Sequence, residues 1–250
     1  MSLPQVVSRD EWLAARKALL TREKELTRTR DALNADRRRL PMVHVAKEYV
    51  FEGPDGKASL LDLFGGRRQL MVVHFMFNPE WTDGCPSCSA SAEERAPGLY
   101  QHLATRDTTL VHVSRAPLPK IEDYQRRKGW TFPWVSSYGS DFNYDYAVTM
   151  DETVAPLEYN YKTLEKHRQA GTDYYFSGPQ PSEQPGMSCF LRDGDTIFHT
   201  YSHYGRGAEQ LGGSYYYLDL TALGRQEEWE EPKGRSGSSR GPRPDFAESD

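Results

Sequence analysis

The sequence predicts an α/β protein with a mixed central sheet flanked by helices and with an N-terminal helical extension. An apolar run of strand length, residues 70–77, precedes a segment of helical pattern, and a second apolar run spans 108–114. A hairpin pattern follows at 188–202, around the turn Asp193-Gly194-Asp195. Strands that alternate with helices usually form parallel pairs, and a late hairpin adds antiparallel strands. The sheet should therefore be mixed.

The composition indicates one sizeable domain with appendages. The chain has 250 residues and a formal net charge of -5, so no global basic field favours binding to nucleic acid or to an anionic membrane. The N-terminus lacks the basic and apolar pattern of a secretory signal, and no apolar stretch reaches membrane-spanning length. We therefore expect a cytoplasmic protein that binds neither nucleic acid nor membrane.

Residues 1–40 are expected to form a helical arm. Ser8 is the expected N-cap, with Asp10 and Glu11 in the first turn. Apolar residues then recur at roughly helical spacing among dense charge, and Pro41 ends the pattern. We interpret this segment as one long helix or two shorter ones that pack on the domain or on a partner chain.

Residues 41–228 are expected to form the main domain, which carries an irregular, aromatic-rich insertion around 130–185. Its other elements are predicted in this order: a strand at 43–51, a turn at 53–56, a short strand and helical turn at 57–64, a helix at 89–105 broken or kinked at Pro97-Gly98, a helix at 119–128, and a closing helix within 205–220. Gly, Ser, Arg and Pro dominate the end of the chain, so 229–250 should be a disordered tail.

The candidate catalytic group is the Cys85-Pro86-Ser87-Cys88 motif, which stands between the central strand and the following helix. An apolar strand, a loop and a CxxC that opens a helix form the usual setting for dithiol redox chemistry. A closed structural zinc site needs four ligands, and no second CxxC exists to supply them. The sequence therefore favours a redox dithiol over half of a zinc site or a chance spacing.

The two cysteines should have different roles. Near the helix N-terminus, amide N–H groups and the helix dipole favour a thiolate, so we assign Cys85 as the attacking group. Pro86 suits the first helical turn. Cys88, one turn into the helix, is the expected resolving thiol that displaces the mixed disulfide on Cys85. Trp81 and Thr82 precede the motif and are expected to support it.

Several separated motifs resemble the thioredoxin-like superfamily, and more closely the bacterial domain-of-unknown-function family 899, whose members are predicted dithiol–disulfide oxidoreductases. The motifs that carry this resemblance are 84–89, 113–118, 129–137, 141–143 and 198–202, and the match covers roughly residues 8–228. The resemblance implies a thioredoxin-like fold, with Cys85 and Cys88 matching the family's dithiol.

The resemblance also assigns two further positions. His74 lies in the strand where thioredoxins carry a buried acid that handles the proton of the resolving thiol. It could accept the proton of Cys88, or it could be a core histidine with a satisfied hydrogen bond. Gln184-Pro185 resembles the cis-proline loop that faces the dithiol in the superfamily and pairs with the substrate backbone.

Two other functions stay open. Thr82-Asp83-Gly84-Cys85-Pro86 resembles the Thr-x-x-Cys-Pro motif of peroxiredoxins, which bind peroxide with an arginine, and the candidates here are Arg115 and Arg192. A copper- or zinc-binding thioredoxin-like module would combine the dithiol with other soft ligands. The available ligands are Cys189, His112, His199 and His203. Cys189 lies in an expected buried strand and is interpreted first as a small apolar residue.

The aromatic segment after residue 129 has three interpretations. It could pack the core, form a subunit interface with Tyr215-Tyr216-Tyr217, or wall a substrate pocket. The expected pocket residues are Trp130, Trp134, Ser136, Ser137, Asp141 and Asn143. The expected partners are a disulfide-bearing protein or small thiol substrate, an electron donor and a second copy of the chain in a homodimer. No cofactor is expected beyond the Cys85–Cys88 disulfide.

Overall fold

A computed structural model describes residues 4–211, 213–221, 227–231 and 233. The chain divides into two compact units. Among the described residues, the first unit combines those before residue 42 with those after residue 213, and the second consists of residues 42–211 and 213. Most of the expected disordered tail lies outside the described residues, and the prediction made for it stays a prediction.

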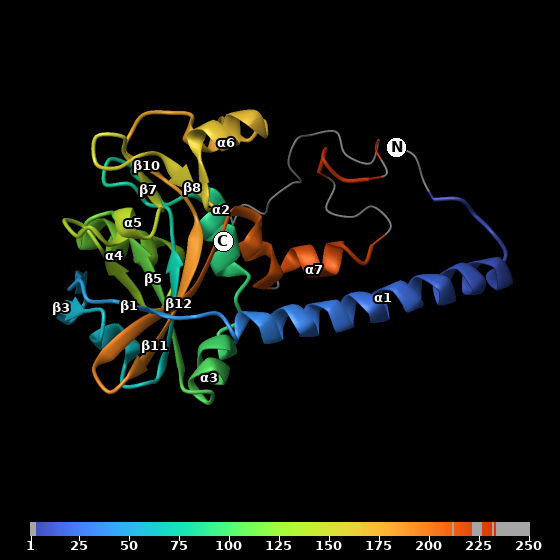
Figure 1. The fold of residues 1–250 in the computed structure, drawn as a ribbon, viewed down its shortest axis with the longest axis horizontal. Helices are drawn as coiled ribbons and strands as arrows, with labels where there is room; N and C mark the ends of the chain where they lie inside the picture. The colour runs from blue at the N-terminus through green and yellow to red at the C-terminus, as the bar shows by residue number, and fades with distance from the viewer. Residues whose placement is uncertain (1–3, 212, 222–226, 232, 234–250) are drawn as a thin grey trace. The chain divides into compact units, whose positions relative to one another are not determined.

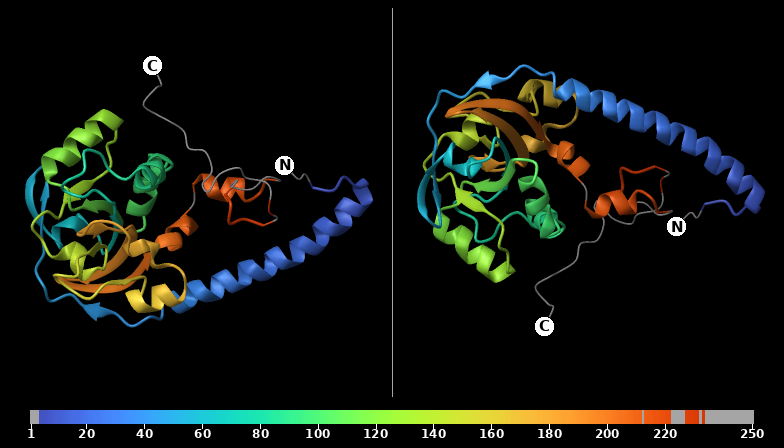
Figure 2. Two further views of the ribbon diagram at one scale, coloured as in Figure 1. Left: turned by 90° about the horizontal axis from the view of Figure 1, so that it is seen from above. Right: turned by 90° about the horizontal axis from the view of Figure 1, so that it is seen from below.

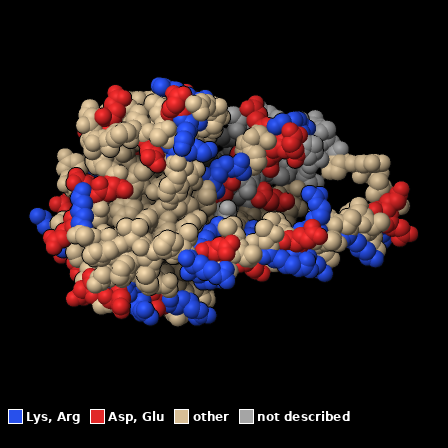
Figure 3. All heavy atoms as spheres, viewed as in Figure 1, with Lys and Arg blue, Asp and Glu red and all other residues tan. Residues whose placement is uncertain are grey.

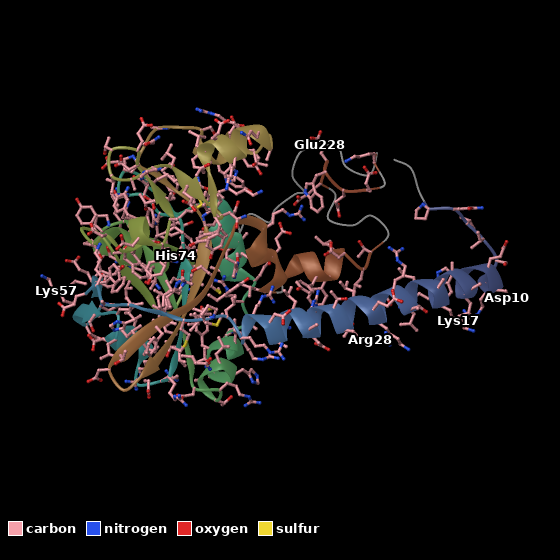
Figure 4. All side chains as sticks on the ribbon, viewed as in Figure 1. Asp10, Lys17, Arg28, Lys57, His74 and Glu228 are labelled. Carbon is pink, nitrogen blue, oxygen red and sulfur yellow. The ribbon has the colours of Figure 1, made fainter. Side chains whose placement is uncertain are left out.

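The first unit contains one long helix, α1 (Arg9–Arg37), rather than two shorter ones. It begins at a capping box, in which Ser8 Oγ accepts from the Glu11 backbone N–H and the Glu11 carboxylate accepts from the Ser8 N–H. No residue of α1 is buried, and both signs of charge are interspersed along it (Figures 3 and 4). The unit also contains the short helix α7 (Ser214–Leu218).

The second unit is built on an eight-stranded sheet with the order β1-β12-β11-β4-β5-β6-β2-β3. Its strands are β1 (Val43–His44), β2 (Val50–Gly53), β3 (Gly56–Ser59), β4 (Gln69–His74), β5 (Thr108–Ser114), β6 (Trp134–Ser136), β11 (Gly186–Asp193) and β12 (Thr196–Tyr204). Figure 1 labels β1, β3, β5, β11 and β12 of this sheet. The predicted hairpin at 188–202 corresponds to β11 and β12, and the turn at 53–56 joins β2 to β3. The mixed sheet is confirmed.

The centre of this sheet has thioredoxin-like topology. β4 pairs in parallel with β5, and β5 pairs in parallel with β6. β11 pairs antiparallel with β4 on one side and with β12 on the other. The four strands β12-β11-β4-β5 thus form the mixed core of a thioredoxin-like fold, and the predicted fold class is confirmed.

Helices connect the parallel strands on one face of the sheet. The predicted helix at 89–105 is interrupted as expected, into α2 (Pro86–Glu93) and α3 (Gly98–Ala104). α4 (Leu118–Lys128) connects β5 to β6 and ends at Gly129, whose φ of 65° gives a left-handed C-cap. In both views of Figure 2, α4 and the α2–α3 segment lie on the same side of the strands.

Each face of the sheet has its own apolar core, because side chains alternate along a strand. Leu70 and Val72 of β4 belong to a cluster that includes Phe142 and Phe190. Phe75, Ile121, Tyr124 and Trp134 belong to a second cluster under α2 and α4, and Cys88 packs against it. We call this second group the helix-side cluster. The dithiol therefore lies on the helix-covered face.

One predicted strand is wrong. Residues 43–51 do not form a single strand, since β1 lies at one end of the sheet order and β2 near the other. The segment that connects them carries Lys47, whose Nζ bonds the carboxylates of Asp141 and Asp145 at 2.8 and 2.7 Å. The Tyr49 hydroxyl donates to the same Asp145 at 2.8 Å. These contacts hold the connecting segment in place. They involve residues far away in the sequence, so the local pattern of residues 43–51 does not distinguish this connection from a strand.

The aromatic-rich insertion is more ordered than the sequence predicts. Its elements after β6 are α5 (Phe142–Asp145), β7 (Thr149–Met150), β8 (Glu158–Tyr159), β9 (Lys162–Thr163), α6 (Leu164–Gln169), a 3-10 turn at Asp173–Phe176 and β10 (Ser182–Glu183). β7 pairs with β10, and β8 pairs with β9. A third apolar cluster, which includes Val148, Met150, Tyr159 and Tyr204, joins the insertion to the end of β12.

The remaining described elements are two 3-10 helices, at Asp62–Phe64 and Gly205–Leu211. The first corresponds to the helical turn predicted within 57–64. Within the described residues, no helix combines the length and the apolar content that a membrane crossing requires.

We predict that Trp134→Ala lowers the free energy of unfolding by about 3–5 kcal/mol, because it removes a large side chain from the helix-side cluster. Trp134 is 2% exposed, and its Nε1 donates to Ser114 Oγ at 2.9 Å. The matched control is Trp12→Ala in α1, where Trp12 is 52% exposed. Urea unfolding followed by circular dichroism measures both variants, and equal losses would contradict the assignment of Trp134 to the core.

Candidate active site

The dithiol stands at the start of α2, beyond the carboxyl end of β4. Cys85 is the N-cap residue of α2 and Pro86 is the first helical residue. The Cys85 N–H donates to Met76 O at 2.9 Å, while Cys85 O accepts from the backbone N–H and the hydroxyl of Ser89. Because Pro has no N–H to satisfy, Pro86 fits this first turn. The predicted position of the CxxC at a helix start agrees with this geometry.

Gly84 allows the loop to pass close to the helix-side cluster. A Cβ atom at this position would lie 2.6 Å from Phe75 Cε1 and 2.9 Å from Tyr124 Cε1. Both distances are shorter than ordinary carbon contacts, so only glycine fits without movement of the two rings. Tyr124 in turn shares a 2.9 Å hydrogen bond with Ser89, one residue after Cys88. The rings of the core thus set the position of the dithiol.

The two cysteines are free thiols with opposite acidities. A hydrogen bond from Cys88 is the main cause that lowers the pKa of Cys85 to about 6, and bonds from the Cys88 and Ser87 backbone and from the Ser87 side chain add to it. The same interaction with Cys85, together with burial, raises the pKa of Cys88 well above its usual value. Cys85 is therefore the thiolate of the pair, and Cys88 holds the proton that it donates to Cys85.

Pro185 lies at the same end of the sheet as the dithiol, but its peptide bond is trans. Gly186 pairs with His74 at the carboxyl end of β4, so the preceding Pro185 stands at that end. Tyr159, which interacts electrostatically with Cys88, donates its hydroxyl to Pro185 O at 2.8 Å. The cis peptide bond is Gln180–Pro181, so the cis assignment considered for Gln184–Pro185 is wrong. At Gln184 the backbone instead runs extended into β11, with its N–H bonded to Val148 O.

His74 does not serve Cys88. It alternates with Phe75, so its ring lies on the opposite face of the sheet from the helix-side cluster. There its Nε2 lies 2.8 Å from Ser188 Oγ, and its ring stacks with that of Tyr146. Burial lowers the pKa of His74 to about 3. It is a neutral core histidine, and the hypothesis that it accepts the Cys88 proton is wrong.

Two residues expected to support the dithiol, Trp81 and Thr82, are not among the groups that make Cys85 acidic. Thr82 is exposed and Trp81 is 36% exposed. Arg192 bonds the carbonyls of Arg67 and Gly66, at the opposite end of β4 from the dithiol. Arg192 is therefore remote from the thiolate, and Arg115 already has Glu183 as its ion-pair partner.

Most of the residues expected to wall an aromatic pocket lie inside the core. Trp134, Ser136, Ser137 and Asn143 are all at most 2% exposed. The hydroxyl of Ser136 donates to Ala116 O, and that of Ser137 donates to Asn143 Oδ1. Their polar atoms form hydrogen bonds inside the core and are not available to bind a substrate. The assignment of these four residues to substrate binding is therefore wrong.

The other two residues of that set lie apart from each other. Trp130 is half-buried against the helix-side cluster, with its ring centroid 5.4 Å from that of Tyr124. Asp141 is exposed and bonds Lys47. Trp130 thus packs against Tyr124, the buried ring that also contacts Ser89 and adjoins Gly84.

The structure contains a buried polar network beside the site that the sequence did not predict. The Glu183 carboxylate, 3% exposed, accepts from Arg115 Nε at 2.7 Å and from Thr149 Oγ1 at 2.7 Å. Asn78, in the loop before the dithiol, donates to Pro181 O at 3.0 Å and lies 3.5 Å from Glu183. Burial raises the pKa of Glu183, and Arg115 opposes that shift. The network connects the dithiol loop to β7 and β10, and no local motif marks it.

The candidate metal ligands do not come together. Among the described residues, no group of three or more His, Cys, Asp or Glu side chains could hold a metal ion. Cys189 is partly buried in β11, and desolvation raises the pKa of its thiol to about 11. His112 bonds Arg95 and His199 bonds Ser202, while His203 lies on β12 opposite Met187. The geometry gives no support to a copper or zinc module built from these groups.

A pocket of about 660 Å³ opens elsewhere on the second unit. It lies between β1, α5 and the start of the insertion, and its lining includes Lys47, Tyr144, Tyr146, Tyr161 and His199. None of the three cysteines lines it. It is therefore separate from the dithiol.

Comparison with known families decides which family this sequence belongs to. A family model described as bacterial protein of unknown function, DUF899, matches residues 1–240. The chain belongs to the DUF899 family. This confirms the resemblance drawn from the sequence motifs, and it assigns no activity to the DUF899 chain. No curated protein matches the sequence.

Solved structures similar to this DUF899 protein share little sequence with it. The bacterioferritin comigratory protein of Xanthomonas campestris is 12% identical, with 69% of this chain and 94% of that chain covered and a TM-score of 0.40. A cysteine mutant of PrxQ from Xylella fastidiosa is 12% identical, with coverages of 65% and 84% and a TM-score of 0.38. A thioredoxin-like protein from Bacteroides caccae is 11% identical, with coverages of 79% and 56% and a TM-score of 0.36. Likenesses at this level carry no conclusion about activity.

We predict that Cys85 is alkylated with an inflection near pH 6, because the thiolate is the reactive form and its fraction rises as the pH passes the pKa of Cys85. In Cys88→Ala the main hydrogen bond is lost, so the inflection should move up towards the ordinary value of about 8.5. Cys88→Ser keeps a hydroxyl donor and should move it less. Mass spectrometry after timed iodoacetamide treatment measures each cysteine, and an unchanged inflection in Cys88→Ala would contradict the assignment.

We predict that Glu183→Gln lowers the free energy of unfolding by about 3–5 kcal/mol, because it leaves the largely buried Arg115 guanidinium without its counter-charge. The control is Asp123→Asn, which removes exposed ion pairs to Arg126 and Arg127 and should cost at most about 1 kcal/mol. Urea unfolding curves compare the two variants. Equal effects would argue against a buried network that fixes the dithiol loop.

Proposed function

We propose that this DUF899 protein is a thiol–disulfide oxidoreductase in which Cys85 attacks and Cys88 resolves. The observation that carries the proposal is the asymmetric dithiol at the N-terminus of α2. Cys85 occupies the N-cap position and receives the hydrogen bond of Cys88, so that one sulfur is acidic while the other keeps its proton. An acidic, partly accessible thiolate next to a protonated thiol is the arrangement that disulfide exchange requires.

The reaction follows from these two states. The Cys85 thiolate attacks one sulfur of a substrate disulfide, forms a mixed disulfide and releases the first substrate thiolate. Cys88 then loses its proton and attacks Cys85 Sγ, which forms the Cys85–Cys88 disulfide and releases the second substrate thiolate. Two electrons pass from the dithiol to the substrate. A separate electron donor must reduce Cys85–Cys88 before the next turnover, and the reverse sequence would oxidise a substrate dithiol.

The surface around Cys85 suits a disulfide carried by a protein or by a small thiol compound. Pro86 and Ser87 are exposed beside Cys85, and the indole of Trp81 is partly exposed in the adjoining loop. Pro185 stands at the same end of the sheet. We propose that a substrate backbone approaches across this surface. A cytoplasmic location and a homodimer stay predictions.

A thiol peroxidase is the alternative, but no contact of the dithiol favours it. Peroxide reduction would leave a sulfenic acid on Cys85 for Cys88 to resolve, which is sound chemistry for the same pair. It also calls for polar groups beside the thiolate to bind the peroxide. The hydroxyl of Thr82 is not among the groups that shift the pKa of Cys85, and Arg115 is bound to Glu183. Disulfide exchange therefore has the better support.

We predict that Cys85→Ser abolishes reduction of insulin disulfides by the protein in the presence of a thiol donor, because the attacking sulfur is lost. Cys88→Ser should retain the first attack and accumulate a mixed disulfide on Cys85, which mass spectrometry detects. The control is Cys189→Ser, which should retain at least half of the wild-type rate, since Cys189 lies in β11 with a raised pKa.

Two results would overturn the proposal. One is insulin reduction by Cys85→Ser at the wild-type rate. The other is rapid, Cys85-dependent consumption of hydrogen peroxide by a protein that reduces no disulfide, which would favour the peroxidase instead.

A further inference from the structure

Five tyrosines line the pocket of the second unit that is separate from the dithiol. They come from the segment before β2, from α5 and its C-cap, from the turn between β8 and β9, and from the end of β12. They are Tyr49, Tyr144, Tyr146, Tyr161 and Tyr204. The volume of about 660 Å³ falls within the range of small-molecule sites in proteins, about 300–1,000 Å³. The pocket therefore has the size and the aromatic content of a site for a small organic ligand.

Three of these tyrosines, Tyr146, Tyr161 and Tyr204, are linked by direct contacts. The ring centroids of Tyr161 and Tyr204 are 5.5 Å apart, with an interplanar angle of 68°. The Tyr204 hydroxyl donates to Tyr146 O at 2.9 Å, and the ring of Tyr146 meets that of His199, which also lines the pocket, at 82°. Rings at such steep angles form walls rather than a flat stack. Aromatic walls of this kind surround the ammonium group in cages that recognise organic cations.

The other two tyrosine rings already have a protein cation over them. Lys47 Nζ lies 5.7 Å from the ring centroid of Tyr49, and Arg115 Cζ lies 5.6 Å from that of Tyr144. The face of an aromatic ring carries negative charge density and attracts a cation at these distances. Within the described part of the chain, no Lys or Arg lies over the three linked rings in this way. Those rings can therefore accept a cation from a ligand.

The charges of the lining favour a cation over an anion. Three acidic residues, Asp145, Asp151 and Glu158, line the pocket, whereas Lys47 is the one lysine in the lining and no arginine belongs to it. Lys47 is already paired with the carboxylates of Asp141 and Asp145. A cleft with an excess of one charge concentrates ligands of the opposite charge. An anionic ligand would meet a net negative charge in this pocket, and a cationic ligand would be attracted.

Tyr161 occupies a backbone position that favours glycine. The two-residue turn between β8 and β9 consists of Asn160 and Tyr161, whose φ angles are 49° and 61°. Turns of this kind usually carry Asn-Gly, because a bulky side chain rarely adopts a positive φ. The Tyr161 hydroxyl donates to Ser202 O at 3.0 Å, yet the residue stays 65% exposed. The turn thus holds a large, exposed ring at the pocket although glycine would suit the backbone better. Strain of this kind is often found at ligand sites.

We propose that this pocket binds a small organic cation, a quaternary ammonium or a protonated amine. The rings of Tyr146, Tyr161 and Tyr204 would face the charged group, and the carboxylates of Asp151 and Glu158 would add to the attraction. The apolar groups of the ligand would fill the space between the rings. The proposal goes beyond the proposed oxidoreductase function and does not depend on it, since no cysteine lines the pocket.

A titration with two probes of equal shape tests the role of charge. Choline carries a quaternary ammonium group, and dimethylbutanol is the alcohol in which carbon replaces the charged nitrogen. We expect one choline to bind per chain, and the neutral alcohol to bind about tenfold more weakly, because the cation–π and ionic attractions are lost. Chemical-shift changes in NMR spectra of the isotope-labelled full chain measure both affinities. Equal affinities, or no saturable binding of choline, would overturn the proposal.

Substitutions of Tyr161 locate the site. Tyr161→Gly removes the ring but suits the positive φ, so we expect the variant to stay folded while its affinity for choline falls about tenfold. Tyr161→Phe keeps the ring and should keep most of the affinity. The matched control is Tyr138→Ala, which removes a tyrosine that is 55% exposed and lies outside the lining, and it should leave the affinity unchanged.

A second pair of variants tests the acidic part of the lining. Glu158→Gln should weaken the binding of choline and leave that of the neutral alcohol unchanged, because it removes only charge. The matched control is Glu122→Gln, at an exposed position of α4 outside the lining. Choline affinity that is unchanged in the folded Tyr161→Gly and Glu158→Gln variants would overturn the proposed site. The two substitutions are independent, so one of them suffices if the other does not fold.

Discussion

The hydrogen bond between the thiol of Cys88 and the thiolate of Cys85 is the interaction on which the account of this site depends. It lowers the pKa of Cys85 and raises the pKa of Cys88, although the two residues are only three positions apart. The start of α2 brings them to this geometry, and Gly84 lets the loop approach the rings of Phe75 and Tyr124. The acidity of the dithiol is thus a consequence of how the core packs beneath it.

The surroundings of the pair divide into two faces of one sheet. On the helix-covered face, Cys88 packs against an aromatic cluster, and Arg95 forms a hydrogen bond with the buried His112. On the opposite face, His74 is bonded to Ser188 and stacked with Tyr146. At the carboxyl end of the strands, the Glu183–Arg115 pair ties the dithiol loop to the insertion. The Nε2 atoms of His74 and His112 each have a hydrogen-bond partner, whereas their buried Nδ1 atoms have none among the described residues.

Local patterns in the sequence predicted much of this fold. Apolar runs, turn residues and the Pro97-Gly98 break located β4, β5, the division between α2 and α3, and the β11–β12 hairpin. The position of Cys85 at a helix start followed from the same patterns. The connection between β1 and β2 could not be predicted from the sequence. An alternating pattern is the same whether the segment forms one strand or links two strands in different parts of the sheet.

The remaining features depend on contacts between distant residues. Arg95 meets His112 across 17 positions, and Arg115 meets Glu183 across 68, so no short motif contains either pair. Trp134, Ser136 and Ser137 matched the composition of a pocket wall, yet the parallel pairing of β6 with β5 places them in the core. Whether a side chain is buried or available to a substrate depends on the face of the sheet to which it points. Neighbouring residues such as His74 and Phe75 point to opposite faces.

The most direct test of the central claim is a redox titration of the reduced protein against glutathione buffers, with the Cys85–Cys88 bond quantified by mass spectrometry. The account predicts a reversible two-electron couple confined to this pair, with Cys189 remaining a free thiol throughout. Failure of Cys85 and Cys88 to form any reversible disulfide would contradict it.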